Sequence, residues 1–189
     1  MKTATVKLTS ASPYSQSRMF TKSEVPPLEK ESAADYDLRT WRHKQHWDRK
    51  TGEIYIPPTA LKNALMEVAQ YLGEKIPGGG TAKWTKHFMA GILCTDPVML
   101  GIQWDETECE TFNCHANGMR SSGKRVPRTF PVVRDWEAAA KFIVLDEKIT
   151  KDLFMRYLDE AGKFIGIGRF RPRNGGFYGR FFVEPINWE

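Results

Sequence analysis

The order of strand-like and helix-like stretches is the feature that most constrains the fold of this chain. Residues 2–10 alternate polar and apolar side chains, which predicts a half-buried strand. Residues 53–56 form a short extended piece that ends at Pro57-Pro58. Residues 59–76 then repeat apolar side chains every three or four positions, which predicts a helix between proline and glycine breaks.

The remaining stretches continue this pattern toward the carboxyl end. In chain order they predict a short helix at 81–90, strands within 92–102, a strand at 136–144, a helix from the Thr150 cap to about Ala161, and a strand at 177–183. Within residues 92–102, the break between the two strands is expected near Asp96-Pro97.

Strand, helix, strand, strand, helix, strand is the βαββαβ order of the ferredoxin-like fold. We therefore predict one α+β domain of this ferredoxin-like (RRM-like) class over residues 1–189. Two polar stretches interrupt the order, and we interpret both as long insertions. Residues 11–52 predict a loop, whereas residues 103–130 carry turn signals at 117–118 and 121–123 and predict turns or a hairpin.

Length and composition exclude several classes of protein. A chain of 189 residues, 41% of them hydrophobic, buries a core without a disulfide or metal staple. No apolar run approaches the roughly 20 residues that span a bilayer, and the start MKTATVKLTS lacks the apolar stretch of a secretory signal. Three cysteines, an odd number, favour a reducing compartment. We expect a cytoplasmic protein with no membrane partner.

Basic charge is concentrated in the carboxyl-terminal part of the chain. Residues 1–118 hold 14 basic and 14 acidic side chains, whereas residues 119–189 hold 14 basic and 9 acidic ones, which accounts for the net charge of +5. Arginine dominates there, and its planar fork of donors matches phosphate and stacks on bases. Such a surface is typical of nucleic-acid-binding proteins, although a solvated basic face has the same composition.

The most informative motif is residues 166–181, named here the Gly/Arg segment, which holds five glycines and four arginines in sixteen residues. Glycine permits positive φ and close backbone approach, so exposed N–H groups beside arginine side chains predict a phosphate cradle. The residues assigned to it are Gly166, Gly168, Arg169, Arg171, Arg173 and Arg180. The segment is not a dinucleotide fingerprint, because Arg171 stands where the third glycine belongs. The alternative is a tight connection with solvated arginines.

A second basic cluster lies in the first insertion. Its cations alternate with indole rings, which suits single-stranded nucleic acid because bases stack on rings and phosphates need neutralising. The candidates there are Trp41, Arg42, Lys44, His46, Trp47 and Arg49. Lys62 is a further candidate for phosphate binding, because it lies in the first turn of the helix after Pro57-Pro58 and a helix N-terminus attracts anions. Ordinary helix capping is the alternative explanation of that helix start.

Two segments together resemble the RAMP proteins of CRISPR effector complexes. One is the stretch YIPPT at residues 55–59 with Leu61-Lys62, and the other is the Gly/Arg segment. RAMP proteins carry a tyrosine-isoleucine-proline-glycine-serine/threonine stretch that leads into a helix, and a Gly-rich loop that runs into a Gly-Tyr/Phe-Gly-Arg strand. The resemblance is strongest to the backbone subunits. This chain departs from the pattern at Pro58 and Asn63, where the family has glycine, and a compact viral or mobile-element relative fits equally well.

The resemblance implies a non-catalytic protein that binds single-stranded RNA, with single-stranded DNA as the alternative ligand. It also implies head-to-tail assembly along a guide (crRNA-like) RNA, together with other CRISPR complex subunits, in antiviral defence. Residues 103–130 would then act as a thumb that inserts between bases or touches a neighbouring subunit. Two other hypotheses stay open, namely a module that mimics a backbone subunit and inhibits a CRISPR complex, and a RAMP-type endoribonuclease.

The endoribonuclease hypothesis has a short set of candidates. They are Asp35, Asp37, His43, His46, His87 and His115. Some RAMP proteins cleave RNA with an aspartate in the loop after the first strand, but the spacing of Asp35 and Asp37 matches that pattern poorly. Cys109 and Cys114, with Cys94 far away in the sequence, have poor spacing for zinc. We expect no catalytic residue, metal or cofactor.

Overall fold

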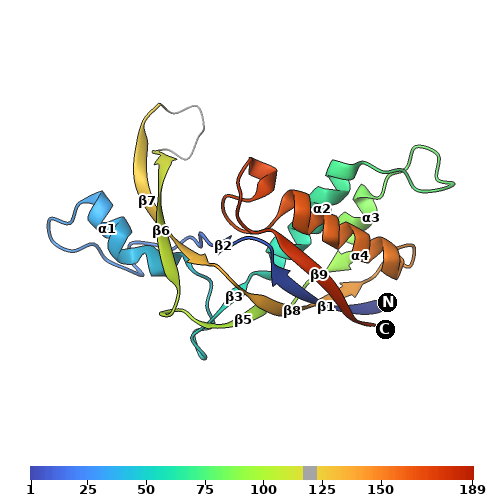
Figure 1. The fold of residues 1–189 in the computed structure, drawn as a ribbon, viewed down its shortest axis with the longest axis horizontal. Coiled ribbons are helices and arrows are strands. Elements are labelled where there is room, and N and C mark those ends of the chain that lie inside the picture. Colours follow the sequence, from blue (N-terminus) through green and yellow to red (C-terminus); the bar gives the residue numbers. More distant parts are fainter. Residues whose placement is uncertain (117–122) are drawn as a thin grey trace.

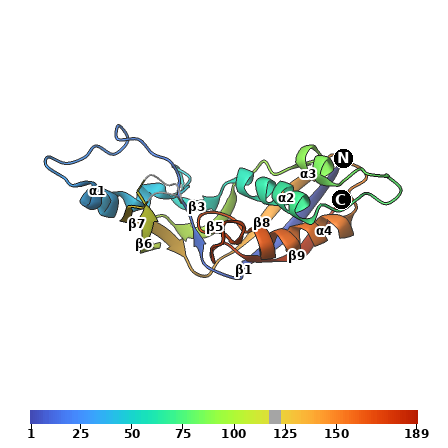
Figure 2. The same cartoon turned by 90° about the horizontal axis from the view of Figure 1, so that it is seen from above.

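The computed structural model describes residues 1–116 and 123–189 and shows an elongated molecule (Figure 1). One end holds a four-stranded sheet with its helices and both chain termini. The other end holds a short helix and a long hairpin. Seen from above, the two ends remain well separated, with α1 far from α3 and α4 (Figure 2).

The four-stranded sheet has the order β4-β8-β1-β9, and every neighbouring pair in it is antiparallel. Its elements and the two long helices that pack on it follow along the chain as β1 (Lys2–Ser10), α2 (Pro58–Leu72), β4 (Ile92–Leu93), β8 (Glu137–Val144), α4 (Lys151–Glu160) and β9 (Phe181–Trp188). The short helix α3 (Thr85–Ala90) precedes β4. The structure therefore confirms the predicted α+β class, and the strand positions within 2–10 and 136–144 agree with the sequence pattern.

Alternation along β1 explains how the sheet forms the core. Ala4, Val6 and Leu8 are buried, and they pair with Phe142, Ala140 and Ala138 of β8. The neighbouring side chains Thr5 and Lys7 are only partly buried because they lie on the opposite face of the sheet. Leucine, alanine and valine of α2 cover the buried face, which is what the apolar spacing of residues 59–76 predicts.

Two predicted boundaries differ from the observed ones. Helix α2 ends at Leu72 and not at 76, because Gly73 adopts a left-handed φ of 60° and caps it. The last strand begins at Phe181 and not at 177. Residues before it belong to the compact Gly/Arg segment, where Gly179 has a φ of 76°.

The Gly/Arg segment folds back on itself. After the π-helical turn η2 (Ala161–Ile165), the Ile167 N–H donates to the Gly179 carbonyl at 2.9 Å, and the Tyr178 N–H donates to the Phe170 carbonyl at 3.0 Å. A Cβ placed on Gly176 would lie 1.7 Å from the Phe170 oxygen. Glycine at 176 is therefore required by close packing, and a short 3₁₀ turn, η3 (Pro172–Asn174), closes the loop.

The other end of the molecule contains more secondary structure than the sequence predicted. Residues 11–52, predicted as a loop, contain β2 (Tyr14–Ser15), helix α1 (Ala33–Thr40) and the 3₁₀ turn η1 (Trp41–Lys44). Ser32 caps α1, since its side chain accepts from the Asp35 N–H. We name residues 18–44 the α1 lobe. The helix escaped prediction because its exposed residues are mostly polar or small and only Asp37 and Thr40 are buried in it.

A long hairpin packs against the α1 lobe. It consists of β6 (Glu108–His115) and β7 (Arg125–Val133), which pair antiparallel, and β2 adds to the other edge of β7. The turn signals at 117–118 and at 121–122 lie outside the described residues. A two-stranded sheet of β3 (Glu53–Ile56) and β5 (Val98–Gln103) lies between the hairpin and the four-stranded sheet (Figure 1). Within the described ranges, no helix has the length and apolar character needed to cross a bilayer.

Candidate nucleic-acid interface

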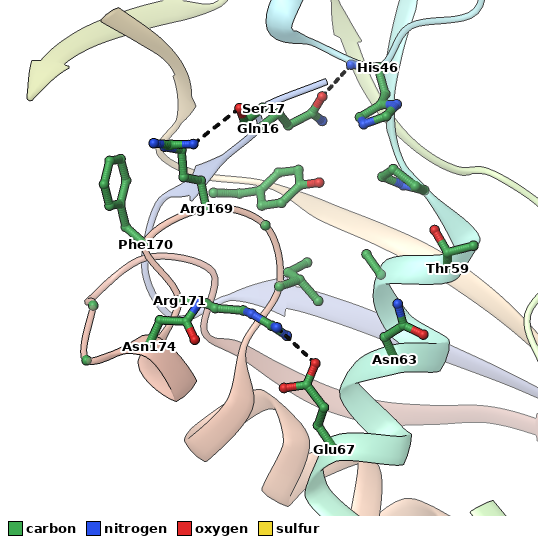
Figure 3. Close-up of a pocket in the computed structure, with 17 residues that line it drawn as sticks. Gln16, Ser17, His46, Thr59, Asn63, Glu67, Arg169, Phe170, Arg171 and Asn174 are labelled. Carbon is green, nitrogen blue, oxygen red and sulfur yellow. Dashed lines mark hydrogen bonds and ion pairs between the residues drawn. The ribbon is translucent and has the colours of Figure 1, made fainter. Parts of the chain in front are cut away.

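A cleft with a volume of about 760 Å³ lies between the start of α2, the Tyr14–Ser17 stretch and the Gly/Arg segment (Figure 3). Helix α2 provides one wall through Thr59, Asn63 and Glu67, which follow one another at i, i+4 spacing and therefore share a face. The Gly/Arg segment provides the opposite wall. Most of the lining side chains carry hydroxyl, amide or guanidinium groups, so the cleft suits a polar, anionic ligand.

The start of α2 adds a positive electrostatic end to this cleft. Pro57 occupies the N-cap and Pro58 the first helical position. A proline N-cap offers no hydroxyl or carboxylate to the orphan N–H groups, so the partial positive charge of the helix dipole is not offset by a capping side chain. Thr59 and Ala60 of this first turn line the cleft. Anions bind favourably at such a helix terminus.

Arg169 is the cation most strongly positioned at the cleft. Its guanidinium carbon lies 3.9 Å from the Phe130 ring centroid and 4.9 Å from that of Phe170. Nη1 donates to the Ser17 hydroxyl at 3.3 Å. Among the described residues, its buried Nε has no hydrogen-bond partner. The ring contacts fix the partly exposed guanidinium in place at the wall of the cleft.

Arg171 and Arg173 converge on one carboxylate across the cleft. Arg171 Nη2 lies 2.9 Å from Glu67 Oε1, and Arg173 Nε lies 3.8 Å from Glu67 Oε2. The pair of Arg171 with Glu67 connects the two walls in Figure 3. Glu67 therefore occupies guanidinium donors that a phosphate would otherwise use.

Two glycines shape the wall that carries these arginines. Gly168 has a φ of 72°, and a Cβ there would lie 2.3 Å from the Ser15 carbonyl oxygen. Any side chain at 168 would separate the segment from β2 and break the bond from the Arg169 N–H to that oxygen, which is 2.8 Å long. Gly166, with a φ of 68°, sets the preceding turn and would place a Cβ 2.6 Å from Pro172.

His46 is the residue of the upstream basic cluster that reaches the cleft. The Gln16 side chain holds it, because Oε1 accepts the His46 N–H while Nε2 donates to the Tyr55 carbonyl at 3.0 Å. Burial lowers the pKa of His46, and the charge of Arg18 lowers it further. His46 is therefore mostly neutral near pH 7 in the free protein.

Lys62 and Arg180 lie outside the cleft. Lys62 is on a neighbouring face of α2, off the stripe of Thr59 and Asn63. Arg180 turns toward the protein backbone, with Nη1 donating to the Phe177 carbonyl at 3.0 Å and Nε to the Lys163 carbonyl at 3.3 Å. Their assignment to phosphate binding is not supported by these positions.

Trp41, Arg42 and Lys44 belong to the packing of the α1 lobe. Trp41 is buried, and the Arg42 guanidinium lies 4.4 Å from its ring centroid. The buried Lys44 ammonium donates to Asp37 Oδ1 at 2.7 Å and to the Thr129 carbonyl at 2.6 Å. Burial lowers the pKa of Lys44, and the bond to Asp37 acts in the opposite direction. Lys44 thus joins the lobe to β7 and is not placed to meet a phosphate.

Trp47 and Arg49 also have internal partners. The Trp47 ring stacks on Trp104 at 5.7 Å, and the Arg49 guanidinium lies 4.4 Å from the Trp47 centroid. Arg49 is exposed and lies 3.5 Å from Glu24. Of the upstream cluster, the structure therefore places His46 at the cleft beside the Gly/Arg segment, whereas Trp41, Arg42, Lys44, Trp47 and Arg49 do not line it.

The catalytic candidates have structural partners. Asp37 is buried and accepts the Thr129 N–H at 2.7 Å in addition to Lys44. Asp35 accepts a bond from the Ser32 hydroxyl at the start of α1. His43 lies among the rings of Phe20, Trp47 and Trp104, and burial lowers its pKa.

The remaining histidines and the cysteines lie apart from the cleft. His87 contacts Asp146 near the end of β8, and His115 is at the end of β6. Cys109 and Cys114 are five residues apart on β6, so their side chains point to opposite faces. Within 1–116 and 123–189, no group of three His, Cys, Asp or Glu side chains is placed to hold a metal ion.

Sequence reasoning missed the α2 wall of the cleft. Thr59, Asn63 and Glu67 form a polar stripe on a helix from which sequence reasoning assigned only Lys62 to the binding site. The i, i+4 spacing of polar residues beside the predicted core face was the available signal. Gln16 carried no such signal, because its role depends on contacts with residues far away in the sequence.

Sequence comparison matches this chain to no family model and to no curated protein. Structural comparison finds similar folds. A chain of the cryo-EM structure of the Type III-B Cmr-beta bound to cognate target RNA is 15% identical with a TM-score of 0.52. The match covers 100% of this chain and 60% of that one. The crystal structure of Cmr6 from Pyrococcus furiosus is 16% identical with a TM-score of 0.50, over 96% of this chain and 98% of that one.

The fold is similar to the folds of these two Cmr chains. The resemblance inferred from residues 55–59 and the Gly/Arg segment is therefore confirmed at the level of fold. These two motifs meet in the structure, since both line the cleft. This chain spans only about 60% of the length of the Cmr-beta chain, and identities of 15 and 16% establish the fold alone.

Proposed function

We propose that this chain is a non-catalytic, RAMP-type subunit of a CRISPR effector complex that binds single-stranded RNA in the cleft. The observation that carries the proposal is the convergence of a helix N-terminus, Arg169 and Arg171 on one cleft. The fold supports it, since a similar chain belongs to a structure bound to target RNA.

Each wall of the cleft would make a different contact with the strand. Arg169 and the first turn of α2 bind phosphate oxygens, because both present positive charge and N–H donors. Phe170, which lines the same cleft, packs on Phe112 at 4.5 Å between ring centroids and supports the Arg169 guanidinium from one side. Hydroxyl and amide groups of Ser17, Thr59 and Asn63 are suited to ribose 2′-hydroxyls, which favours RNA over DNA.

The hairpin β6–β7 is the thumb in this proposal. It stands away from the four-stranded sheet on the side where the Gly/Arg segment lies (Figure 1). Its base contacts that segment, as Tyr178 donates to Glu110 at 2.6 Å. We include head-to-tail contacts with further copies or with other subunits along a guide RNA, because the hairpin projects beyond the rest of the molecule.

Substitution of Arg169 tests the proposal against a matched control. Arg169→Ala should weaken binding of a fluorescent single-stranded RNA about tenfold, and the slope of log affinity against log salt should become shallower by about 0.7, the value for one phosphate contact. Arg169→Lys should recover part of the affinity because it keeps the charge. Arg180→Ala, in the same segment but outside the cleft, should leave affinity nearly unchanged.

Anisotropy titrations at several salt concentrations provide the measurement. Absence of RNA binding by the wild-type protein, or an equal loss in Arg180→Ala, would contradict the proposed cleft. Inhibition of a CRISPR complex by a protein that binds no RNA would support the mimic hypothesis in its place.

A further inference from the structure

A pair of exposed aromatic rings lies beyond the cleft. Tyr71 is 56% exposed and Phe164 is 46% exposed. Their rings stack with centroids 5.6 Å apart and an interplanar angle of 27°. They come from different elements, the last turn of α2 and the π-helical turn η2. Together the two rings present an exposed aromatic surface, and a flat aromatic surface is one on which a base can stack.

The position of Tyr71 continues the wall of the cleft. Asn63, Glu67 and Tyr71 follow one another at i, i+4 spacing, so they form one stripe along α2. Each step along this stripe is about 6 Å, from 1.5 Å of rise per residue. The stripe therefore runs from the cleft, past the carboxylate that holds Arg171 and Arg173, to the aromatic pair.

The position of Phe164 is set by unusual backbone geometry. Residues 161–165 form a π-helical turn directly after α4, and such turns occur frequently at functional sites. Gly162 makes the turn fit, because a Cβ there would lie 2.2 Å from the Phe181 carbonyl oxygen. The turn leaves Phe164 exposed beside α2, while Ile165 is buried.

We propose that Tyr71 and Phe164 form a base-stacking platform for the single-stranded RNA that leaves the cleft. This inference rests on the proposed function. The strand passes along the α2 stripe, where its phosphate meets the guanidinium donors of Arg171 and Arg173 that Glu67 does not occupy, and the next base stacks on the aromatic pair. Stacking on a ring needs no base-specific hydrogen bond, so the platform accepts any base.

The surroundings of the pair favour a nucleic acid over a protein partner. Charged side chains lie next to the rings, since Lys163, which pairs with Asp159 at 2.6 Å and with Glu160 at 3.7 Å, precedes Phe164, and Glu67 lies one helical turn before Tyr71. The apolar surface is limited to two rings, which matches one flat base. The core of a stable protein interface is larger and depleted in charged residues.

Oligonucleotide length separates this inference from the proposed function. A short oligouridine of about 2 nucleotides fills the cleft alone, because Tyr71 lies only about 6 Å along α2 from Glu67 of the cleft, and one of about 10 nucleotides also reaches the platform. The wild-type protein should bind the longer RNA more tightly. Tyr71→Ala and Phe164→Ala should each weaken binding of the longer RNA about tenfold and leave the short RNA unaffected, whereas Tyr71→Trp keeps a stacking ring and the affinity.

Phe182→Ala is the matched control. Phe182 is 58% exposed and lies on β9, where its neighbour Phe181 points into the core and Phe182 points to the other face of the sheet. It should change neither affinity. Equal affinities of the wild type for both lengths, or unchanged binding of the longer RNA by both alanine variants, would overturn the platform while leaving the cleft intact. Failure of the wild type to bind the short RNA would instead remove the proposed function and the platform with it.

Discussion

The Gly/Arg segment and the α1 lobe contain the same kinds of side chain, but their cations face different surroundings. In the Gly/Arg segment, Arg169 stacks on two rings at the wall of the cleft, and its guanidinium donates to the Ser17 hydroxyl. In the α1 lobe, Lys44 is buried against Asp37 and a backbone carbonyl. Cations next to aromatic rings therefore serve binding in one region and packing in the other. The difference lies in whether an internal carboxylate or carbonyl satisfies the charge.

The largest expected effect concerns the lobe. Asp37→Ala should lower the free energy of unfolding by about 3–5 kcal/mol, because it leaves the Lys44 ammonium without its carboxylate and the Thr129 N–H without its acceptor. Urea unfolding provides the measurement. Asp35→Ala, at an exposed position of the same helix, should cost less than about 1 kcal/mol. If both variants lost a similar free energy of unfolding, the buried pair of Asp37 with Lys44 would stabilise the lobe no more than contacts at its surface do.

A smaller effect is expected from the carboxylate in the cleft. Glu67→Gln should raise RNA affinity about threefold, since it frees the donors of Arg171 and Arg173 from a partly exposed ion pair worth ~0.7 kcal/mol. Glu74→Gln removes the partner of Arg156 away from the cleft and should have no effect. Weaker binding by Glu67→Gln would mean that Glu67 positions Arg171 for the RNA and does not compete with it.

The smallest effect concerns His46, which lies where the two regions meet. Its pKa is lowered from 6.5 by burial, so lowering the pH from about 7.5 to about 5.5 protonates it in part and should raise RNA affinity about twofold. His46→Gln should flatten that rise. Binding titrations at several pH values give the measurement, and an equal rise in the variant would assign it to another group.

The same pKa shift makes the free protein less stable in acid. A histidine whose pKa is lower in the folded state binds more protons when the chain unfolds. Its contribution to stability is therefore complete above pH 6.5 and is lost as the pH falls from that value toward the folded pKa. His43, whose pKa burial also lowers, acts in the same direction.

Local patterns predicted the parts of the fold that local physics determines. The alternation in residues 2–10 and the apolar spacing after Pro58 identified β1 and α2 because each element buries one face of its own. The Gly/Arg segment was found from residue type, since few structures need four arginines among five glycines. These inferences did not require knowledge of distant contacts.

The parts that escaped prediction depend on tertiary partners. Lys44 and Arg169 both lie near aromatic residues in the sequence, and only the fold places one beside Asp37 and the other beside the cleft. The sequence around Glu67 predicts only an exposed helical position. Its role depends on the contact with Arg171, which lies far away along the chain. Helix α1 was missed because an exposed, polar helix has no strong apolar period.

The back-folded Gly/Arg segment has a consequence for how quickly a strand is captured. Glycine-rich sequences are commonly flexible, but here Gly176 and Gly179 are required because other backbone atoms lie where a Cβ would be. The bonds from Ile167 and Tyr178 hold the loop in one shape before any ligand arrives. An incoming strand therefore spends little chain entropy on ordering the loop. Its arrival should be limited by diffusion and charge attraction, without a slower loop-closing step.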